Sequence, residues 1–262
     1  MLELSNRQKA VLGHLSRAAF ILMFFCLVFS LAIGIANHKN KRTATPSSVT
    51  PAAAEGAVRV EDMIFIGEST TSHLKSRGVL EGGKNTCRVW SNDQNTMALD
   101  LNILQKTIRY PKTGQLMTIP DAVRAEKPPC VVLSFGVNGI TTFAQNERLY
   151  QAAYGKLIDA IREASPATQV ILQTVYPVAS NQTALSQGAV TINGYIARLN
   201  ALLPEIAASH DAYVVDTASV LRDADGHLRA DYQAGDGIHL TREAYVAILD
   251  YLRAHPIEKE EL

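Results

Sequence analysis

MIFIGEST, residues 63–70, is the stretch that decides the fold. It joins a short apolar run, typical of a buried strand in a parallel sheet, to the polar sequence Gly-Glu-Ser-Thr. A similar join occurs in VVLSFGVNG, residues 131–139, where Asn138 follows the apolar run. Because ligands bind at the carboxyl ends of parallel strands, Ser69 and Asn138 are predicted to face one crevice.

Outward from this stretch, strand-like and helix-like segments alternate. The patterns predict strands at 62–66, 87–90, 130–135, 169–175 and 212–216, and helices at 69–76, 147–164, 191–208 and 241–254. Such alternation implies right-handed βαβ units. The predicted fold class is α/β, a three-layer α/β/α sandwich around a flavodoxin-like five-stranded parallel sheet of order 2-1-3-4-5. Residues 103–118 contain a Pro/Gly turn and predict a β-hairpin that overhangs the site.

A third stretch, DGIH at 236–239, puts Asp236 and His239 three residues apart. At this spacing the carboxylate can fix the imidazole tautomer and stabilise its cation, so His239 is a candidate general base. Ser69, at a predicted helix N-terminus, is the candidate nucleophile. The alternatives are structural: Ser69 as a helix N-cap, and Asp236 with His239 as a capping loop.

The side-chain amide of Asn138 is a candidate donor to an oxyanion. Gly136 and Gly139 flank it, so a tight turn with Asn138 in the left-handed conformation is the alternative. The two roles are compatible, because a turn residue can still present its side chain.

Together these motifs resemble the SGNH hydrolases, the GDSL-type lipase/esterase family, over roughly residues 60–255. The resemblance implies the SGNH hydrolase fold and a triad of Ser69, His239 and Asp236. It also implies an oxyanion hole made by the Ser69 N–H, the Asn138 amide and a backbone N–H after the second strand. The position of this last donor, a glycine in the family, is best matched by Asn95. No cofactor and no metal are implied.

Two further positions depart from the family pattern. Glu68 stands where the family usually has Asp, which keeps a carboxylate but moves it by one methylene, and Gly139 stands at another Asp position. The competing α/β-hydrolase design requires Gly-x-Ser-x-Gly, which this chain lacks.

Residues 18–36 form an uncharged apolar run long enough to span a bilayer as a helix. We therefore expect a cytoplasmic arm at 1–17, a transmembrane signal anchor at 18–36, a Thr/Ala/Ser/Pro-rich linker at 37–57 and a hydrolase domain at 58–262 outside the cytoplasm. Two alternatives stay open. The anchor could be cleaved, which would release a secreted domain, or the apolar run could form a buried core helix.

The distribution of charge bears on the class of partner that the domain binds. Residues 1–42 hold six of the 25 basic and one of the 25 acidic residues, so the remainder has 19 basic and 24 acidic residues, a net charge of −5. A mildly acidic domain disfavours nucleic-acid binding.

Cys87 and Cys130 are predicted to be free and mostly buried, because two strand spacings of about 9–10 Å would separate them.

The function expected from these features is a membrane-anchored extracytoplasmic serine esterase that hydrolyses O-acyl esters, O-acetyl first among them, on cell-envelope or other glycans. Two alternatives remain: an O-acyltransferase with the same triad, and a non-catalytic glycan-binding module on the same fold. The glycan expectation rests on the family resemblance and the expected location. The oligomeric state is left open.

Overall fold

The computed structural model describes residues 58–257. The predicted cytoplasmic arm, membrane anchor and linker, at 1–17, 18–36 and 37–57, lie outside the described residues. Among residues 58–257, no helix combines the length and the hydropathy that crossing a bilayer requires.

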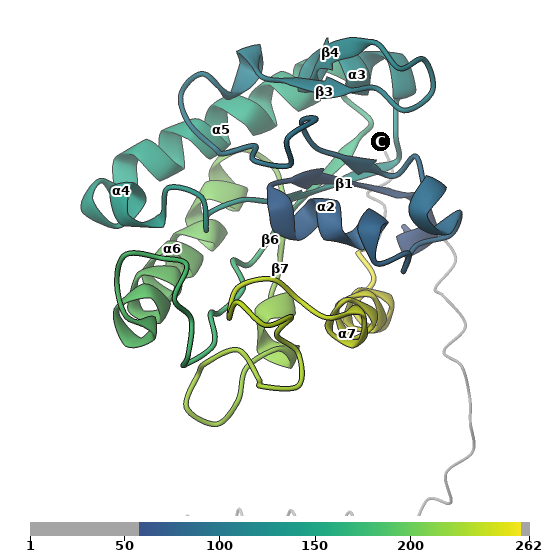
Figure 1. The fold of residues 1–262 in the computed structure, drawn as a ribbon. Coiled ribbons are helices and arrows are strands. Elements are labelled where there is room, and N and C mark those ends of the chain that lie inside the picture. The colour runs from purple at the N-terminus through teal and green to yellow at the C-terminus, as the bar shows by residue number, and fades with distance from the viewer. Residues whose placement is uncertain (1–57, 258–262) are drawn as a thin grey trace, which may run out of the picture. The chain divides into compact units, whose positions relative to one another are not determined.

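A five-stranded parallel sheet forms the centre of the domain (Figure 1). Its order is β2-β1-β5-β6-β7, which is the predicted order 2-1-3-4-5 once the hairpin strands are set aside. The strands are β1 (Met63–Gly67), β2 (Val89–Trp90), β5 (Cys130–Ser134), β6 (Gln169–Gln173) and β7 (Tyr213–Val215). β1 lies between β2 and β5, so the loops after all three strands emerge at the same edge.

Helices connect the strands and cover both faces of the sheet. They are α2 (Ser69–Ser76), α3 (Ile119–Glu126), α4 (Ile140–Gln145), α5 (Glu147–Ala164), α6 (Ala189–Ser209) and α7 (Arg242–Ala254), with 3-10 turns η1 (Val60–Asp62), η2 (Gly83–Asn85), η3 (Ile103–Gln105) and η4 (Thr217–Val220). The bounds of α2 and α5 are those predicted, and α6 and α7 differ from prediction by one or two residues.

Alternate side chains of each strand point into two separate cores. On β1, Ile64 and Ile66 join the core that includes residues of α3, α5 and α6, whereas Met63 and Phe65 join the core that includes residues of α2 and α7. Figure 1 shows these helices on opposite sides of the sheet. Burying one such side chain stabilises the fold by about 1.5–3 kcal/mol, which explains the unbroken apolar runs of the strands.

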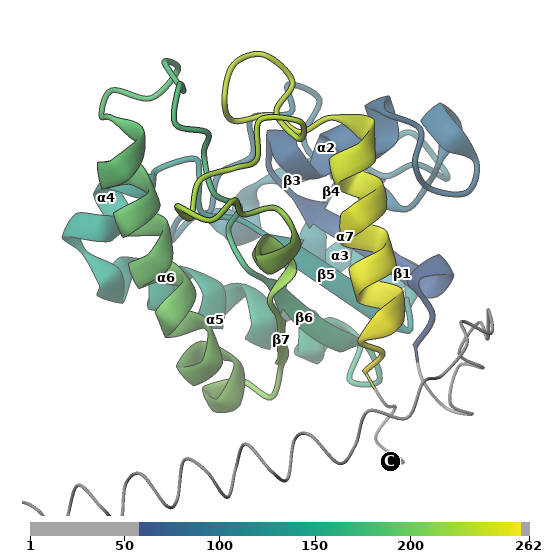
Figure 2. The same ribbon diagram turned by 90° about the horizontal axis from the view of Figure 1, so that it is seen from below.

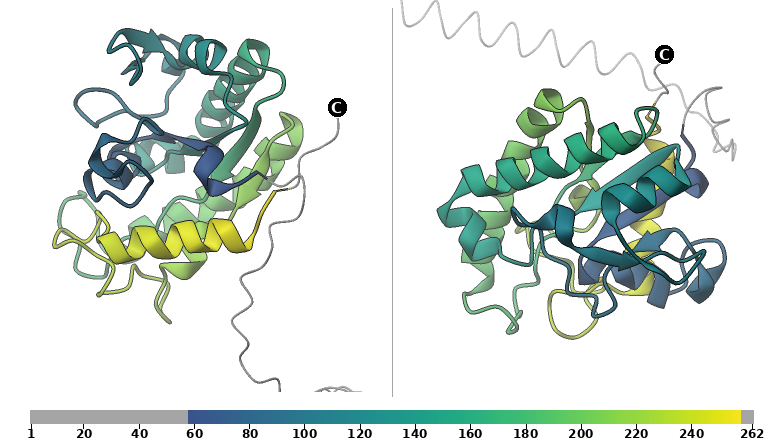
Figure 3. Two further views of the ribbon diagram at one scale, coloured as in Figure 1. Left: turned by 90° about the vertical axis from the view of Figure 1, so that its right-hand side faces the viewer. Right: turned by 90° about the horizontal axis from the view of Figure 1, so that it is seen from above.

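The predicted β-hairpin is present between β2 and β5. β3 (Thr107–Arg109) pairs antiparallel with β4 (Leu116–Thr118), and α3 follows β4 directly, as seen from two further directions in Figure 3. The ring of Tyr110, just after β3, packs edge-on against Trp90 of β2, with the ring centroids 5.9 Å apart. This contact fixes the hairpin to the edge strand of the sheet.

Two short helices, α3 and α4, were not predicted. α3 begins with Thr118 as N-cap, whose hydroxyl accepts the Asp121 N–H at 3.2 Å, and with a proline in its first turn. α4 spans only six residues and starts after Gly139 in the left-handed conformation. Both are too short for a helical period to stand out in the sequence.

Cys87 and Cys130 are both free, as predicted, but only Cys130 is buried. The expectation of a mostly buried Cys87 is wrong, because β2 begins only at Val89 and Cys87 lies exposed in the loop before it. Burial raises the pKa of the Cys130 thiol to about 12, so this thiol stays protonated at neutral pH.

Candidate active site

Ser69 is the first residue of α2 and stands two residues beyond the end of β1. The first N–H groups of a helix have no intrahelical partner, so the Ser69 N–H lies among unpaired donors. Gly67 makes the sharp join possible: a Cβ there would lie 2.2 Å from the Thr71 hydroxyl and 2.3 Å from the Ser134 carbonyl oxygen. Only glycine therefore fits at the last position of β1.

The structure brings His239 and Asp236 to this serine across 170 residues of sequence. His239 Nε2 lies 3.0 Å from Ser69 Oγ, and His239 Nδ1 lies 2.5 Å from Asp236 Oδ2. A carboxylate only accepts hydrogen bonds, so it holds the proton on Nδ1 and leaves the Nε2 lone pair toward Ser69. This is the arrangement in which a histidine can take a proton from a serine hydroxyl.

Asp236 is held as an anion. Burial acts to raise its pKa, but hydrogen bonds from the His239 side chain and from the backbone N–H groups of Ile238 and His239 outweigh it and lower the pKa to about 2. The two backbone bonds, both 2.9 Å, end on Oδ1 and leave Oδ2 for the imidazole. The carboxylate therefore stays ionised at neutral pH.

The loop that carries this pair is fixed by its own backbone. Gly237 has a φ of 75°, and a Cβ there would lie 2.6 Å from the Gln182 Cα. The Gln233 side chain accepts the N–H groups of Gly235 and Gly237, at 2.9 and 3.2 Å. These contacts leave Asp236 little freedom to turn away from the imidazole.

α7, which follows the Asp236–His239 loop, is tied directly to α2. The Tyr245 hydroxyl donates to the Thr70 carbonyl oxygen at 2.6 Å. Figure 2 shows the first turn of α7 beside α2. One buried hydrogen bond thus connects the helix that begins at Ser69 with the helix that begins three residues after His239.

Glu68, next to the serine, is buried, with 2 % of its surface exposed. Its carboxylate accepts the N–H groups of Val137 and Asn138, at 2.9 and 2.8 Å, and so ties the loop after β5 to the start of α2. Burial raises the pKa of Glu68 to about 7, against the lowering effect of backbone hydrogen bonds from Asn138, Val137 and Gly136. The departure from Asp to Glu therefore supplies a carboxylate that reaches across to the neighbouring loop.

The same loop is supported from below by two buried tyrosines of α5. The hydroxyls of Tyr150 and Tyr154 donate to the Phe135 carbonyl oxygen, at 3.3 and 3.2 Å. Tyr154 Oη also accepts the Phe135 N–H at 3.2 Å. The start of the loop is thus anchored on both of its backbone groups.

Asn138 sits on this anchored loop. Its amide Nδ2 donates to the Met97 carbonyl oxygen at 3.3 Å, and its backbone donates to Glu68. Gly136 and Gly139 have positive φ angles, whereas Asn138 does not, so the alternative of a left-handed Asn138 is wrong. An amide nitrogen carries two hydrogens, and Met97 takes one of them.

The structure does not favour the predicted role of Asn95 as an oxyanion donor. It has a φ of 55°, the left-handed conformation that a glycine position allows. Its backbone N–H, however, donates to the Asn92 carbonyl oxygen at 2.9 Å. The donor proposed for the oxyanion is therefore used within its own turn.

His73 is a neighbour of the site that the sequence analysis did not single out. Its ring centroid lies 4.6 Å from that of His239, at an interplanar angle of 43°. Burial lowers the pKa of His73, and the charges of His239 and Arg77 lower it further, against Asp236, so the ring is held neutral. The sequence spacing could have identified His73, because Ser69 and His73 are one helical turn apart and share a face of the helix.

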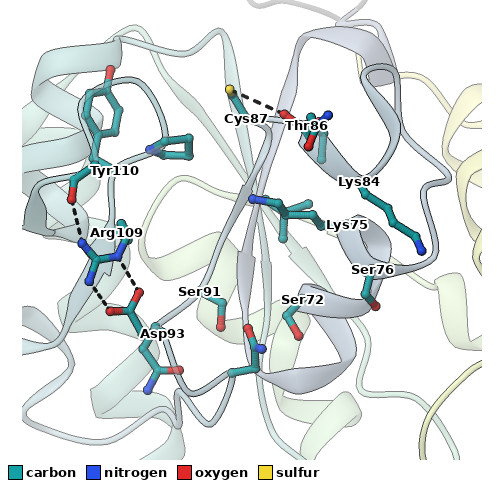
Figure 4. A pocket seen from close by; sticks show the side chains of 16 residues that line it. Ser72, Lys75, Ser76, Lys84, Thr86, Cys87, Ser91, Asp93, Arg109 and Tyr110 are labelled. Carbon is teal, nitrogen blue, oxygen red and sulfur yellow. Dashed lines mark hydrogen bonds and ion pairs between the residues drawn. The ribbon is translucent and has the colours of Figure 1, made fainter.

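A cavity of about 590 Å³ opens between α2 and the hairpin, with Ser72 of α2 in its lining (Figure 4). α2, the segments on either side of β2 and the turn of the hairpin line it. Ser72, one of its lining residues, donates its hydroxyl to the Ser69 carbonyl oxygen at 2.8 Å. Within residues 58–257, no group of three or more His, Cys, Asp or Glu side chains is arranged to hold a metal ion.

Comparisons with known proteins agree with this fold. The sequence profile of the GDSL-like lipase/acylhydrolase family matches residues 65–247. Among solved structures, a protein of Slackia heliotrinireducens assigned to the SGNH hydrolases is 19 % identical with a TM-score of 0.52, and the match covers 76 % of this chain and 98 % of that one. A GDSL-like lipase of Bacteroides thetaiotaomicron is 16 % identical with a TM-score of 0.51, covering 84 % and 94 %. A search of curated protein sequences gives no match.

Proposed function

This chain belongs to the GDSL-like lipase/acylhydrolase family and is thus a hydrolase of the esterase class, and we propose that it cleaves O-acyl esters through Ser69, His239 and Asp236. The observation that carries the proposal is the unbroken chain of contacts from Ser69 Oγ to His239 Nε2 and from His239 Nδ1 to Asp236 Oδ2. A helix N-cap and a capping loop have no need to meet in this way.

In the proposed first half-reaction, Ser69 Oγ attacks the ester carbonyl carbon while His239 Nε2 takes the hydroxyl proton. The negative charge that develops on the carbonyl oxygen is held by the Ser69 N–H at the start of α2 and by the second N–H of the Asn138 amide. The C–O bond to the alcohol then breaks, and His239 gives its proton to the leaving oxygen. Asp236 stabilises the imidazolium throughout.

In the second half-reaction, water replaces the alcohol. His239 takes a proton from this water as it attacks the acyl-enzyme carbonyl, and the same two donors hold the oxyanion. When the Ser69 ester bond breaks, the carboxylic acid leaves and the serine hydroxyl regains its proton from His239. No group outside the chain and its substrate is needed.

The test is hydrolysis of p-nitrophenyl acetate, butyrate and octanoate by the purified chain. We expect turnover with the fastest rate on acetate, and loss of that turnover in Ser69→Ala. No reaction with any ester would favour the glycan-binding module. Transfer of acetyl to an added sugar in preference to water would favour the acyltransferase, and product analysis with and without the sugar separates the two reactions.

The proposed location is the outer face of a membrane, with residues 18–36 as a single-pass anchor and the hydrolase domain outside the cytoplasm. The support is the uncharged apolar run of residues 18–36 and its position near the N-terminus. An O-acylated glycan of the cell envelope is the substrate class that this location favours. A reporter fused after Leu262 that is active only outside the cytoplasm should be active, and a silent reporter at normal expression would contradict the location.

A further inference from the structure

The cavity between α2 and the hairpin carries positive charge in a domain that is otherwise acidic. Three cationic side chains line it, those of Lys75, Lys84 and Arg109, against one carboxylate, that of Asp93. The chain beyond residue 42 has a net charge of −5. The cavity charge is therefore opposite in sign to that of the domain, and a positive cleft attracts anions.

The single carboxylate of the cavity is already neutralised. Asp93 Oδ1 accepts Arg109 Nε at 2.9 Å, and Asp93 Oδ2 accepts an Arg109 terminal nitrogen in the same bidentate pair. In the part of the chain that the structure describes, no carboxylate lies within ion-pair distance of Lys75 or Lys84. The two ammonium groups are thus free to meet a ligand.

Ser91 also lines the cavity, and its Oγ is shielded from solvent without a hydrogen-bond partner among the described residues. Figure 4 shows Lys75 extending from α2 into the space between α2 and the hairpin, with Ser91 on the strand side of the same space.

The position and chemistry of the cavity indicate which part of a substrate it holds. Ser72, which lines the cavity, follows Ser69 by one turn of α2, so one end of the cavity lies near the nucleophile. Most of the residues that line it are polar or charged, beside apolar ones such as Val89 and Pro111, which suits a hydroxylated moiety better than a long acyl chain. A volume of about 590 Å³ accommodates one or two sugar rings.

We propose that this cavity is a subsite for an anionic alcohol moiety, a sugar that bears a carboxylate or phosphate, with Lys75 as its principal cation. The proposal rests on the esterase function proposed above and names the class of alcohol that the ester carries. Lys84 adds a second positive charge at the same cavity.

The experiment uses matched pairs of acetylated sugars and measures acetate release by the full-length chain. One pair is O-acetyl methyl glucuronoside and its neutral glucuronamide. The other is O-acetyl methyl glucoside 6-phosphate and the unphosphorylated glucoside. We expect a lower KM for the anionic member of at least one pair, and the pair with the larger difference identifies carboxylate or phosphate.

Lys75→Gln should raise the ratio of anionic to neutral KM about fivefold, the effect of one exposed ion pair, and Lys75→Arg should restore it. The difference should shrink at high salt, because exposed charges are screened. Lys156→Gln, an exposed lysine of α5 away from the cavity, is the matched control and should leave the ratio unchanged.

Equal KM values within both pairs, or a Lys75→Gln ratio equal to that of the parent, would overturn the subsite. Failure of the proposed function looks different, because then neither the anionic nor the neutral esters release acetate. The two proposals are therefore separable in a single set of assays.

Discussion

The loops after β5 and after β2 flank the nucleophile on either side, yet they are held in different ways. The loop after β5 carries Asn138 and is anchored by the buried carboxylate of Glu68 and by two buried tyrosines. The loop after β2 carries Asn95 and is held near it by exposed contacts: the Asn92 side chain accepts the Thr96 N–H at 2.8 Å, and Asp93 pairs with Arg109. The difference indicates that an oxyanion donor is held in place by hydrogen bonds from buried side chains to the loop that carries it.

The first way to break this comparison is to remove the anchored donor. Asn138→Ala should lower kcat on p-nitrophenyl acetate by roughly 10²–10³, the usual loss for one oxyanion donor, because the developing charge loses a fixed partner. Unfolding by urea should change little, since the backbone bonds to Glu68 remain. A kcat within threefold of the parent would reduce Asn138 to a turn residue.

Removing the anchor itself should have the next largest effect. Glu68→Gln places an amide N–H₂ against the N–H of Val137 or Asn138, so the loop must shift, and kcat should fall by roughly 10- to 100-fold. Glu68→Asp, the matched control, keeps the charge but falls one methylene short, and its loss should be smaller. Activity equal to the parent in Glu68→Gln would show that the loop needs no buried carboxylate.

Glu68 also predicts a pH dependence of stability. Because its pKa is raised from 4.5 to about 7 in the folded chain, the native state holds a proton in that range that the unfolded state lacks. Its contribution to the free energy of unfolding is complete below pH 4.5 and is lost as the pH rises through 7. Between pH 5 and 8 the free energy of unfolding of the parent, measured with urea, should fall by about 2–3 kcal/mol more than that of Glu68→Gln. Parallel pH profiles would contradict the raised pKa.

The His239 ring is also held in place by a neighbour, His73, which packs against it. His73→Ala should leave space beside the His239 ring and lower kcat roughly tenfold, whereas His73→Phe keeps an aromatic ring there and should stay within about threefold of the parent. Equal losses in both variants would indicate that the imidazole chemistry of His73 matters. No loss in either would show that His239 is held without it.

The smallest effect is expected in the exposed loop. Asn92→Ala removes the side chain that closes the turn around Asn95, and it should cost about 0.5–1.5 kcal/mol of stability while leaving kcat on p-nitrophenyl acetate within about threefold. The catalytic donors lie on other elements, so the turn has little to misplace. A loss of kcat as large as that of Glu68→Gln would return Asn95 to the oxyanion hole.

The sequence predicts well where burial is periodic and poorly where a single contact decides. The strands and the helix α5 follow from apolar runs and repeats, and the alternation of strands with helices indicates the fold class. The meeting of Ser69 with the Asp236–His239 pair required the family resemblance, because 170 residues separate the serine from the histidine. A contact at that separation leaves no local signal.

The parts that were missed share a physical reason. The use of the Asn95 N–H within its turn and the grip of Glu68 on the next loop are each one hydrogen bond or two, set by tertiary geometry. Cys87 is exposed because β2 starts two residues later than its apolar pattern indicates. Ends of elements depend on caps and neighbours, which periodicity does not encode.

The central claim is that Ser69, His239 and Asp236 act as one proton-transfer unit, and the most direct test compares Ser69→Ala, His239→Ala and the double variant on p-nitrophenyl acetate. Each single change should lower kcat by roughly 10⁴–10⁶, and the double variant should be no more than about threefold worse, because either change disables the same step. Losses that multiply in the double variant, or a Ser69→Ala chain that keeps its activity, would contradict the claim.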